Sequence, residues 1–455
     1  MRNLRCVNKL TISGIGQADD VVASSNNIYM LYNLLVLALD YCRKYNVQLC
    51  ADKTKLLMYA DKTFSVPLNS IFMNGEEVPF NDEAEHVGII RSTKGNLPNL
   101  INRIHCSKTA TNATLASGLA RGHRSNPAAC LAVLRCYGTP VLMSGLGSLV
   151  LNNKEVNLIH QHHKNTIRCL QKLPDETPQA VIYFMSGTLP ATALLHERQL
   201  CLFGMVSRLP NDPLNSHARH ALIIAKKNSS SWFGQIRDLC LQYSLPHPLT
   251  LLDSPLSKVK FKCLIKSKIT DFWEKKLRSE AEPLTSLLYF KPMFMSLARP
   301  HAIWWTAGAN PYEVSKAVIQ CRMLSGRYRT LLLTSNWTES SESCCPAPSC
   351  SQTEESLEHI LLDCPEYAQT RINLVEKIKT AKNEEACKLA MFALKQPPAF
   401  LMQFLLDASA LPVTMNLVSN VGEELLFSVF SLTRTWCYAL HRERRNLLRR
   451  LKTKC

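Results

Sequence analysis

The sequence has no hydrophobic run long enough to span a bilayer. The longest purely apolar stretch near its start covers only residues 34–39, whereas a membrane helix needs about 20 apolar residues. The start, Met1-Arg2-Asn3-Leu4-Arg5, is not followed by the apolar segment of a secretory signal peptide. Internal repeats and long low-complexity tracts are also absent from the sequence. We therefore expect no membrane partner and a nuclear or cytoplasmic location.

Acidic residues are scarce relative to basic ones. The 36 Asp and Glu stand against 53 Lys and Arg, and the formal net charge is +17. This excess favours a polyanionic partner, with binding that weakens as salt rises. The 18 cysteines, in a chain without a signal peptide, favour a reducing compartment in which they are buried thiols or metal ligands. A hydrophobic content of 46% is that of an ordinary globular protein.

The stretch from Gly14 to Ala23 carries two adjacent carboxylates, Asp19 and Asp20. Strand-forming residues flank the pair and glycines permit a turn, so we expect a hairpin with both carboxylates at its tip. A turn lets two neighbouring side chains approach one metal ion, and carboxylate oxygens suit Mg²⁺. A solvated Asp-Asp pair on a loop is the alternative.

This stretch resembles the Ala-Asp-Asp box of reverse transcriptases, although Gln17 stands where an aromatic residue usually precedes the Ala. Two further segments follow in the family's order. Lys53-Thr54-Lys55 resembles the lysine-bearing box, and His86-Val87-Gly88-Ile89 resembles the turn called the primer grip. The pattern resembles the C-terminal portion of a non-LTR (LINE-type) retrotransposon reverse transcriptase, starting just before the Ala-Asp-Asp box. It implies RNA-directed DNA polymerase (nucleotidyltransferase) chemistry with an RNA template and a DNA primer or target.

The resemblance implies catalytic roles for four residues. Asp19 and Asp20 would bind Mg²⁺, and Lys53 or Lys55 would lie near the incoming triphosphate as a cation or proton donor. The sequence does not choose between the two lysines, and lysines on a solvated edge are the alternative. No Asp or Glu precedes Asp19, so the family's upstream Asp box is missing. We expect this chain alone to be inactive as a polymerase.

Helical spacing dominates from Leu97 onward, with basic residues between the apolar positions. The resemblance makes this region a thumb that grips duplex through phosphates, whereas a solvated basic face would contain the same residues. His160, His162 and His163 predict a mixed polar helix face rather than a metal site. The nucleic-acid-binding candidates are the grip turn, thumb cations and C-terminal arginines, namely His86, Gly88, Arg103, Lys108, Arg121, Arg124, Arg444, Arg445, Arg449 and Arg450.

Three later segments differ in composition. Residues 210–256, rich in Pro, Asn and Ser, predict a linker with one helix around Trp232. Residues 257–285 interleave lysines with aromatic residues, which suits nucleic acid or, equally, an amphipathic helix with its aromatic face in the core. Residues 425–451 predict one long helix with a dense basic end, which is typical of nucleic-acid binding or nuclear import, with a solvated tail as the alternative.

A cluster of metal-ligand residues lies near the C-terminus. Cys345, Cys350, His359 and Cys364 have the spacing Cys-x4-Cys-x8-His-x4-Cys, and Cys344 is an alternative to Cys345. Four such ligands in a short span suit a closed tetrahedral Zn²⁺ site; a chance cluster is the alternative. The block also resembles the Cys-Cys-His-Cys knuckle of many LINE-type proteins. A closed site implies a structural role, folding a small module that touches RNA or target DNA.

The sequence thus predicts an α+β fold with five consecutive parts. These are a partial reverse-transcriptase palm (a small antiparallel sheet plus a helix) at 1–95, a helical thumb and connection at 96–209, a basic helical linker region at 210–335, a zinc-knuckle-like module at 336–370, and a C-terminal helical region with a basic tail at 371–455. The predicted function is the C-terminal fragment of a LINE-type RNA-directed DNA polymerase. The alternatives are a non-catalytic, zinc-dependent nucleic-acid-binding protein derived from a retroelement, and a helical scaffold without a nucleic-acid role. The sequence does not predict an oligomeric state.

Overall fold

The computed structural model describes residues 14–17, 20–25, 27–50, 52–59, 71–73, 75–116, 125–210, 212–224, 231–338, 343–350 and 353–452. Within these ranges the chain is mostly helical and carries small antiparallel sheets, which agrees with the predicted α+β class. The chain divides into two compact units. Unit 1 comprises residues 1–106, 143–159 and 198–262, and unit 2 comprises residues 107–142, 160–197 and 263–455. These boundaries differ from those of the five predicted parts.

Unit 1 contains the strands. They are β1 (Gly14–Gln17), β2 (Asp20–Ala23), β3 (Ile71–Met73), β4 (Glu76–Val78), β5 (Glu83–His86) and β6 (Ile89–Ser92). Each pairs antiparallel with its sequence neighbour, giving three hairpins, β1-β2, β3-β4 and β5-β6. Among the described residues no sheet has more than two strands. The single small sheet that the sequence predicted is therefore replaced by three separate ribbons.

Helix α1 (Ile28–Lys44) packs on the β3-β4 hairpin. It begins at Asn27, whose side chain accepts a hydrogen bond from the backbone N–H of Tyr29, as asparagine does at a helix N-cap. One apolar face of α1 packs against a small core of Ile71, Met73 and Val78. The rest of its surface stays exposed, including several large aromatic and aliphatic side chains.

Residues with positive φ lie in the turns of the β3-β4 and β5-β6 hairpins. Gly75, in the turn between β3 and β4, has a φ of 89°, which glycine adopts at no steric cost. The turn between β5 and β6 places Val87 at φ 52° and Gly88 at φ 72°, as a type I′ turn requires. A β-branched residue in this region is strained. The turn predicted at the grip segment thus forms.

The predicted linker is helical. Residues 210–256 form three helices rather than one, α8 (Pro213–Ile224), α9 (Trp232–Gln242) and α10 (Pro248–Asp253). Helix α8 contacts both α9 and α10, and Leu222, Ile236 and Leu251 are buried. The Pro and Asn residues that suggested a linker instead lie between or at the starts of these short helices.

Four long helices begin in one unit and end in the other. They are α2 (Leu97–Thr114), α5 (Asn153–Leu170), α7 (Ala191–Ser207) and α11 (Lys258–Ala281). Helix α6 (Gln179–Ser186) ends at Gly187, before α7 begins. Gly187 has a φ of 59°, and a Cβ there would lie 2.0 Å from the carbonyl carbon of Arg299. Only glycine fits this position without movement of the backbone.

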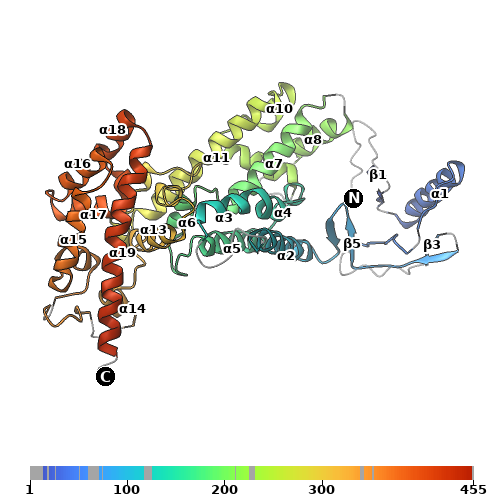
Figure 1. The fold of residues 1–455 in the computed structure, drawn as a ribbon. Coiled ribbons are helices and arrows are strands. Elements are labelled where there is room, and N and C mark those ends of the chain that lie inside the picture. Colours follow the sequence, from blue (N-terminus) through green and yellow to red (C-terminus); the bar gives the residue numbers. More distant parts are fainter. Residues whose placement is uncertain are drawn as a thin grey trace. The chain divides into compact units, whose positions relative to one another are not determined.

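Unit 2 is built around one long C-terminal helix, α19 (Glu424–Lys452). Its other helices are α3 (Pro127–Val133), α4 (Thr139–Leu142), α12 (Ala302–Trp305), α13 (Pro311–Leu324), α14 (Leu331–Thr338), α15 (Ala368–Lys379), α16 (Glu384–Ala393), α17 (Pro398–Asp407) and α18 (Pro412–Val421). Figure 1 shows α15 to α18 gathered along α19, which also packs against α13. The predicted long helix forms, and Leu426, Val429, Phe430, Trp436 and Leu440 are buried along it.

Among the described residues no single helix has the length and apolar character that a bilayer span needs. One bent pair of helices, Pro398–Ala410 with Pro412–Val421, meets the requirement by length and composition alone.

Candidate metal centre and basic surfaces

Cys345, Cys350, His359 and Cys364 come together in unit 2. One ligand atom from each lies within 4.8 Å of the others, and all four residues are buried. Among the described residues this is the one group that gathers three or more such donors. Cys344, the alternative first ligand, is exposed and pairs through its backbone with Glu354 instead.

Two local turns bring the ligands together. The backbone N–H of Cys350 donates to the carbonyl of Ala347, and that of Cys345 donates to the carbonyl of Thr353, which closes a loop around the first two cysteines. Ser356 begins the following helix, because its hydroxyl accepts a hydrogen bond from the backbone N–H of His359 at 3.0 Å. A π-helical segment, His359–Asp363, then places Cys364 beside the same point.

The donor set fits a tetrahedral metal ion. Zn²⁺–sulfur bonds of about 2.3 Å at tetrahedral angles put sulfur atoms about 3.8 Å apart. Sγ of Cys364 lies 3.9 Å from Sγ of Cys345 and 3.5 Å from Sγ of Cys350. Nε2 of His359 is buried and has no hydrogen-bond partner among the described residues. A metal ion would satisfy this nitrogen, so the buried Cys3His group can bind a metal such as zinc.

Burial makes these thiols poor acids when no cation is near. It raises the pKa of Cys364 to about 12 and also raises the pKa of Cys345. A divalent cation stabilises the thiolate forms and is bound in exchange for their protons. Metal affinity at this group therefore falls with decreasing pH.

The ligand loop is anchored to α19 by a residue that the sequence analysis missed. Glu355, which lies between the second and third ligands, is fully buried. Its carboxylate accepts hydrogen bonds from Nε and Nη2 of Arg444 at 2.8 and 2.7 Å, and a third from the backbone N–H of Leu331 at 2.7 Å. Trp436 adds a hydrogen bond from its indole N–H to the carbonyl of Leu361. The sequence does not reveal this anchoring role of Glu355, because its partner Arg444 lies 89 residues away.

Arg444 differs from the other C-terminal arginines predicted to bind nucleic acid. It is buried and committed to Glu355, so it does not belong to an exposed phosphate-binding surface. Arg445, Arg449 and Arg450 lie on exposed positions of α19. The basic end of this helix therefore divides into an inward, paired arginine and an outward, exposed set.

The polymerase-like residues are only partly described. Ala18 and Asp19 lie outside the described residues, and Asp20 is described only as the first backbone position of β2, paired with Gln17. The predicted Mg²⁺ site thus has no described geometry. Lys53 and Lys55 are exposed, and nothing in their described surroundings chooses between them.

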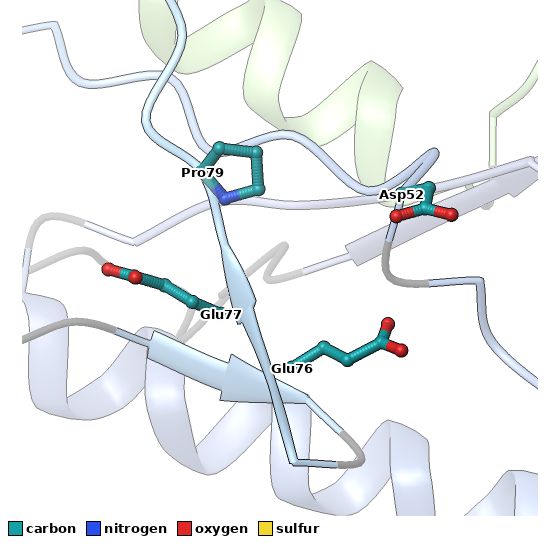
Figure 2. A pocket seen from close by; sticks show the side chains of 4 residues that line it. All are labelled: Asp52, Glu76, Glu77 and Pro79. Carbon is teal, nitrogen blue, oxygen red and sulfur yellow. The ribbon is translucent and has the colours of Figure 1, made fainter.

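A shallow acidic depression lies in unit 1 beside Lys53. Asp52, Glu76, Glu77 and Pro79 line it. In Figure 2, the carboxylates of Asp52 and Glu76 lie on the same side of β4, whereas Glu77 extends from the opposite side. All three acidic residues are exposed. Exposed carboxylates of this kind are common on protein surfaces, and no role is assigned to them.

The grip-like turn lies close to a predicted thumb residue. His86 ends β5, and a Cβ built on Gly88 would lie 3.7 Å from Nη2 of Arg103. Nε2 of His86 and Nε of Arg103 are both buried without hydrogen-bond partners among the described residues. Lys108, farther along α2, is exposed, and Arg121 and Arg124 lie outside the described residues.

The aromatic residues of α11 face the protein rather than solvent. Phe261 and Trp273 are buried, together with Ile265 and Ile269, while most lysines of the helix are exposed. The amphipathic-helix interpretation therefore applies, and the aromatic rings that would stack on bases are largely withdrawn into the core.

The histidine group on α5 is not a polar surface. His163 is 1% exposed, and neither of its ring nitrogens has a hydrogen-bond partner among the described residues. Burial, with a smaller contribution from His160 and His162, lowers its pKa to about 3, so the ring stays neutral. His160 bonds through Nε2 to Oε1 of Gln179. The predicted mixed polar face is wrong for His163, because helical spacing alone could not reveal that this position points into the core.

Ser409, Asp407 and His301 also lie together, yet they do not form a catalytic triad. Nε2 of His301 faces both Asp407, at 3.3 Å, and the Ser409 hydroxyl, at 3.4 Å. The other ring nitrogen, Nδ1, accepts the backbone N–H of Ile303. A base that activates a serine needs one nitrogen for the serine and the other for the carboxylate. This group instead fastens the start of α12 to the end of α17.

Comparison with known proteins identifies no relative. The chain matches no protein-family model, and neither a curated protein nor a solved structure shows significant similarity to it. The functional assignment therefore rests on the residues and geometry described above.

Proposed function

We propose that this chain binds nucleic acid through a zinc-stabilised module and exposed basic helices, as a C-terminal portion of a LINE-type RNA-directed DNA polymerase that includes the Ala-Asp-Asp box. The observation that carries the proposal is the buried Cys3His group, whose donors have the separations of a closed tetrahedral zinc site. A closed site has no open position for substrate. Zinc therefore folds the module, and the surrounding cations contact the nucleic acid.

Charge supports the choice of partner. The chain carries a net charge of +17. Helix α19 contacts the zinc module through the hydrogen bonds of Arg444 to Glu355 and ends in the exposed Arg445, Arg449 and Arg450. Arginines that are held on a rigid helix bind phosphates with little loss of conformational freedom. The order of the Ala-Asp-Asp, lysine and grip-like segments supports a polymerase origin, and the grip-like segment forms a two-residue hairpin.

The first experiment measures zinc in the purified chain, together with its binding to a fluorescent single-stranded RNA. We expect one zinc ion per chain and RNA binding that weakens steeply between 50 and 200 mM salt. Cys345→Ser should lose the zinc and weaken RNA binding. Cys344→Ser is the matched control: it removes the neighbouring exposed thiol and should change neither.

Two results would contradict the proposal. Full zinc occupancy in Cys345→Ser would contradict the proposed metal centre, because this cysteine would then not be a zinc ligand. The absence of RNA binding by the zinc-loaded chain at low salt would favour a helical scaffold. Asp19→Ala serves as a further control. Unchanged RNA affinity in this variant would assign binding to the module and basic helices rather than to the polymerase-like hairpin.

A further inference from the structure

A second concave site lies in unit 2, and it is strongly basic. The pocket has a volume of about 350 Å³. Its lining residues are Pro174, Ile319, Arg322, Arg327, Tyr328, Arg329, His441 and Arg444. None of these described lining residues is acidic. Four arginines surround one hollow; Arg444 is paired with the buried Glu355, and the like charges gathered with it repel one another, which favours an anion in the hollow.

The fold brings these arginines together from distant parts of the sequence. Arg322 lies near the end of α13, and His441 and Arg444 lie one turn apart on α19, which packs against α13. The segment after α13 turns at Gly326, where φ is 65° and a Cβ would lie 2.1 Å from the carbonyl oxygen of Ser286. This tight turn leads directly to Arg327, Tyr328 and Arg329.

Much of the pocket wall is held in place. The guanidinium of Arg322 donates from Nε and Nη2 to the carbonyl of Lys172, at 3.0 and 2.8 Å. Arg444 is fixed by its two hydrogen bonds to Glu355. The Tyr328 hydroxyl and Nδ1 of His441 lie 2.8 Å apart. These lining side chains are therefore already fixed before a ligand binds, which lowers the entropy cost of binding.

The local electrostatics favour an anion. Burial, with smaller contributions from the charges of Arg445, Arg444 and Arg322, lowers the pKa of His441 to about 4. The ring is therefore neutral at physiological pH. If the Tyr328 hydroxyl donates to Nδ1, the proton of the neutral ring is on Nε2, which becomes a donor. The pKa of Arg322 is also lowered, first by burial and then by repulsion from Arg329. An anion in the pocket would relieve this repulsion.

We propose that this pocket binds a phosphate group of a nucleic-acid strand, with the exposed Arg329 available to the phosphate and Arg322, Arg327, His441 and Arg444 forming the wall. The planar fork of arginine matches phosphate oxygens better than a point charge does. The volume exceeds that of a bare ion and admits the attached sugar. The choice of a strand as the source of the phosphate rests on the proposed nucleic-acid function and on the exposed arginines that continue along α19.

Charge reversal at the pocket tests this proposal. Arg329→Glu changes an exposed residue, so the fold should persist. Lys382→Glu is the matched control, with the same charge change at an exposed position of unit 2 that does not line the pocket. Affinity for a fluorescent 12-nucleotide single strand is measured by anisotropy at several salt concentrations. We expect Arg329→Glu to weaken binding by at least tenfold and to reduce the salt slope by about 0.7 per lost phosphate contact. The control should change affinity by less than about threefold.

A second measurement separates this pocket from the proposed function. The titration of His441 is followed by NMR with and without inorganic phosphate. A bound anion should raise its pKa in the wild-type chain but not in Arg329→Glu. If the wild-type chain binds no strand but phosphate still shifts His441, the phosphate site stands, its source is a free phosphate compound, and the proposed function fails. If Arg329→Glu binds the strand as the control does and phosphate leaves His441 unchanged, the pocket proposal is wrong while the proposed function stands.

Discussion

The buried pair of Glu355 and Arg444 offers the sharpest test of how the zinc module is held. Glu355→Leu would leave the guanidinium of Arg444 buried without its carboxylate and would free the backbone N–H of Leu331. Removing one partner of a buried ion pair costs about 3–5 kcal/mol. Burial alone would lower the pKa of Arg444, but the hydrogen bonds and charges of Glu355 and Tyr328 together outweigh burial and raise that pKa.

The same loss is expected from Arg444→Met, because a buried carboxylate is then left unpaired. The double variant Glu355→Leu, Arg444→Met removes both charges and should recover most of the stability. We therefore expect a double-mutant cycle with a coupling energy of at least about 2 kcal/mol. Arg442→Met is the control: Arg442 is exposed on the same helix and lies 3.7 Å from Glu443, and exposed pairs contribute about 0–1 kcal/mol.

Hydrogen exchange of the zinc-loaded chain, read by mass spectrometry, reports the local stability of residues 353–364 and of the end of α19. A loss of 3–5 kcal/mol corresponds to roughly two to four orders of magnitude in exchange protection, since about 1.4 kcal/mol is a factor of ten. Wild-type protection in either single variant would refute the reasoning. A double variant as poorly protected as the sum of the two singles would refute the coupling.

Three further predictions concern individual positions. The pKa of His163 is about 6.5 in the unfolded chain and about 3 in the folded chain. Its contribution to stability is therefore complete above pH 6.5 and decreases as pH falls. When the pH is lowered from 7.5 to 5, the free energy of unfolding should fall by about 2 kcal/mol less in His163→Leu than in the wild type, as measured by denaturant unfolding. Gly187→Ala should destabilise unit 2 by about 2–5 kcal/mol, because its Cβ would meet the backbone of Arg299; unchanged thermal stability would contradict this. Val87→Gly should stabilise the β5-β6 hairpin by about 0.5–1 kcal/mol, because φ is 52° there, and lower amide protection in the variant would count against it.

Local sequence signals predicted local structure well. Asn27 and Asn126 cap helices α1 and α3, and the residues of the predicted Cys345 to Cys364 spacing assemble into one buried donor group. Each of these features depends on residues close together in the chain, where helix spacing, turn geometry and capping chemistry decide the outcome. The long apolar stripe of α19 was visible for the same reason.

The sequence alone determined the α+β fold class, the metal-ligand set except for the choice between Cys344 and Cys345, and the apolar faces of its helices. Only the tertiary structure decided that Cys345 rather than Cys344 completes the donor group, that Arg444 pairs with Glu355, and that His163 is buried. Helical periodicity identifies the apolar face of a helix but not which residues pack against that face. The partners of Arg444 and the arginines of the basic pocket are separated by many residues, and only the packing of α19 against α13 and the zinc module brings them together.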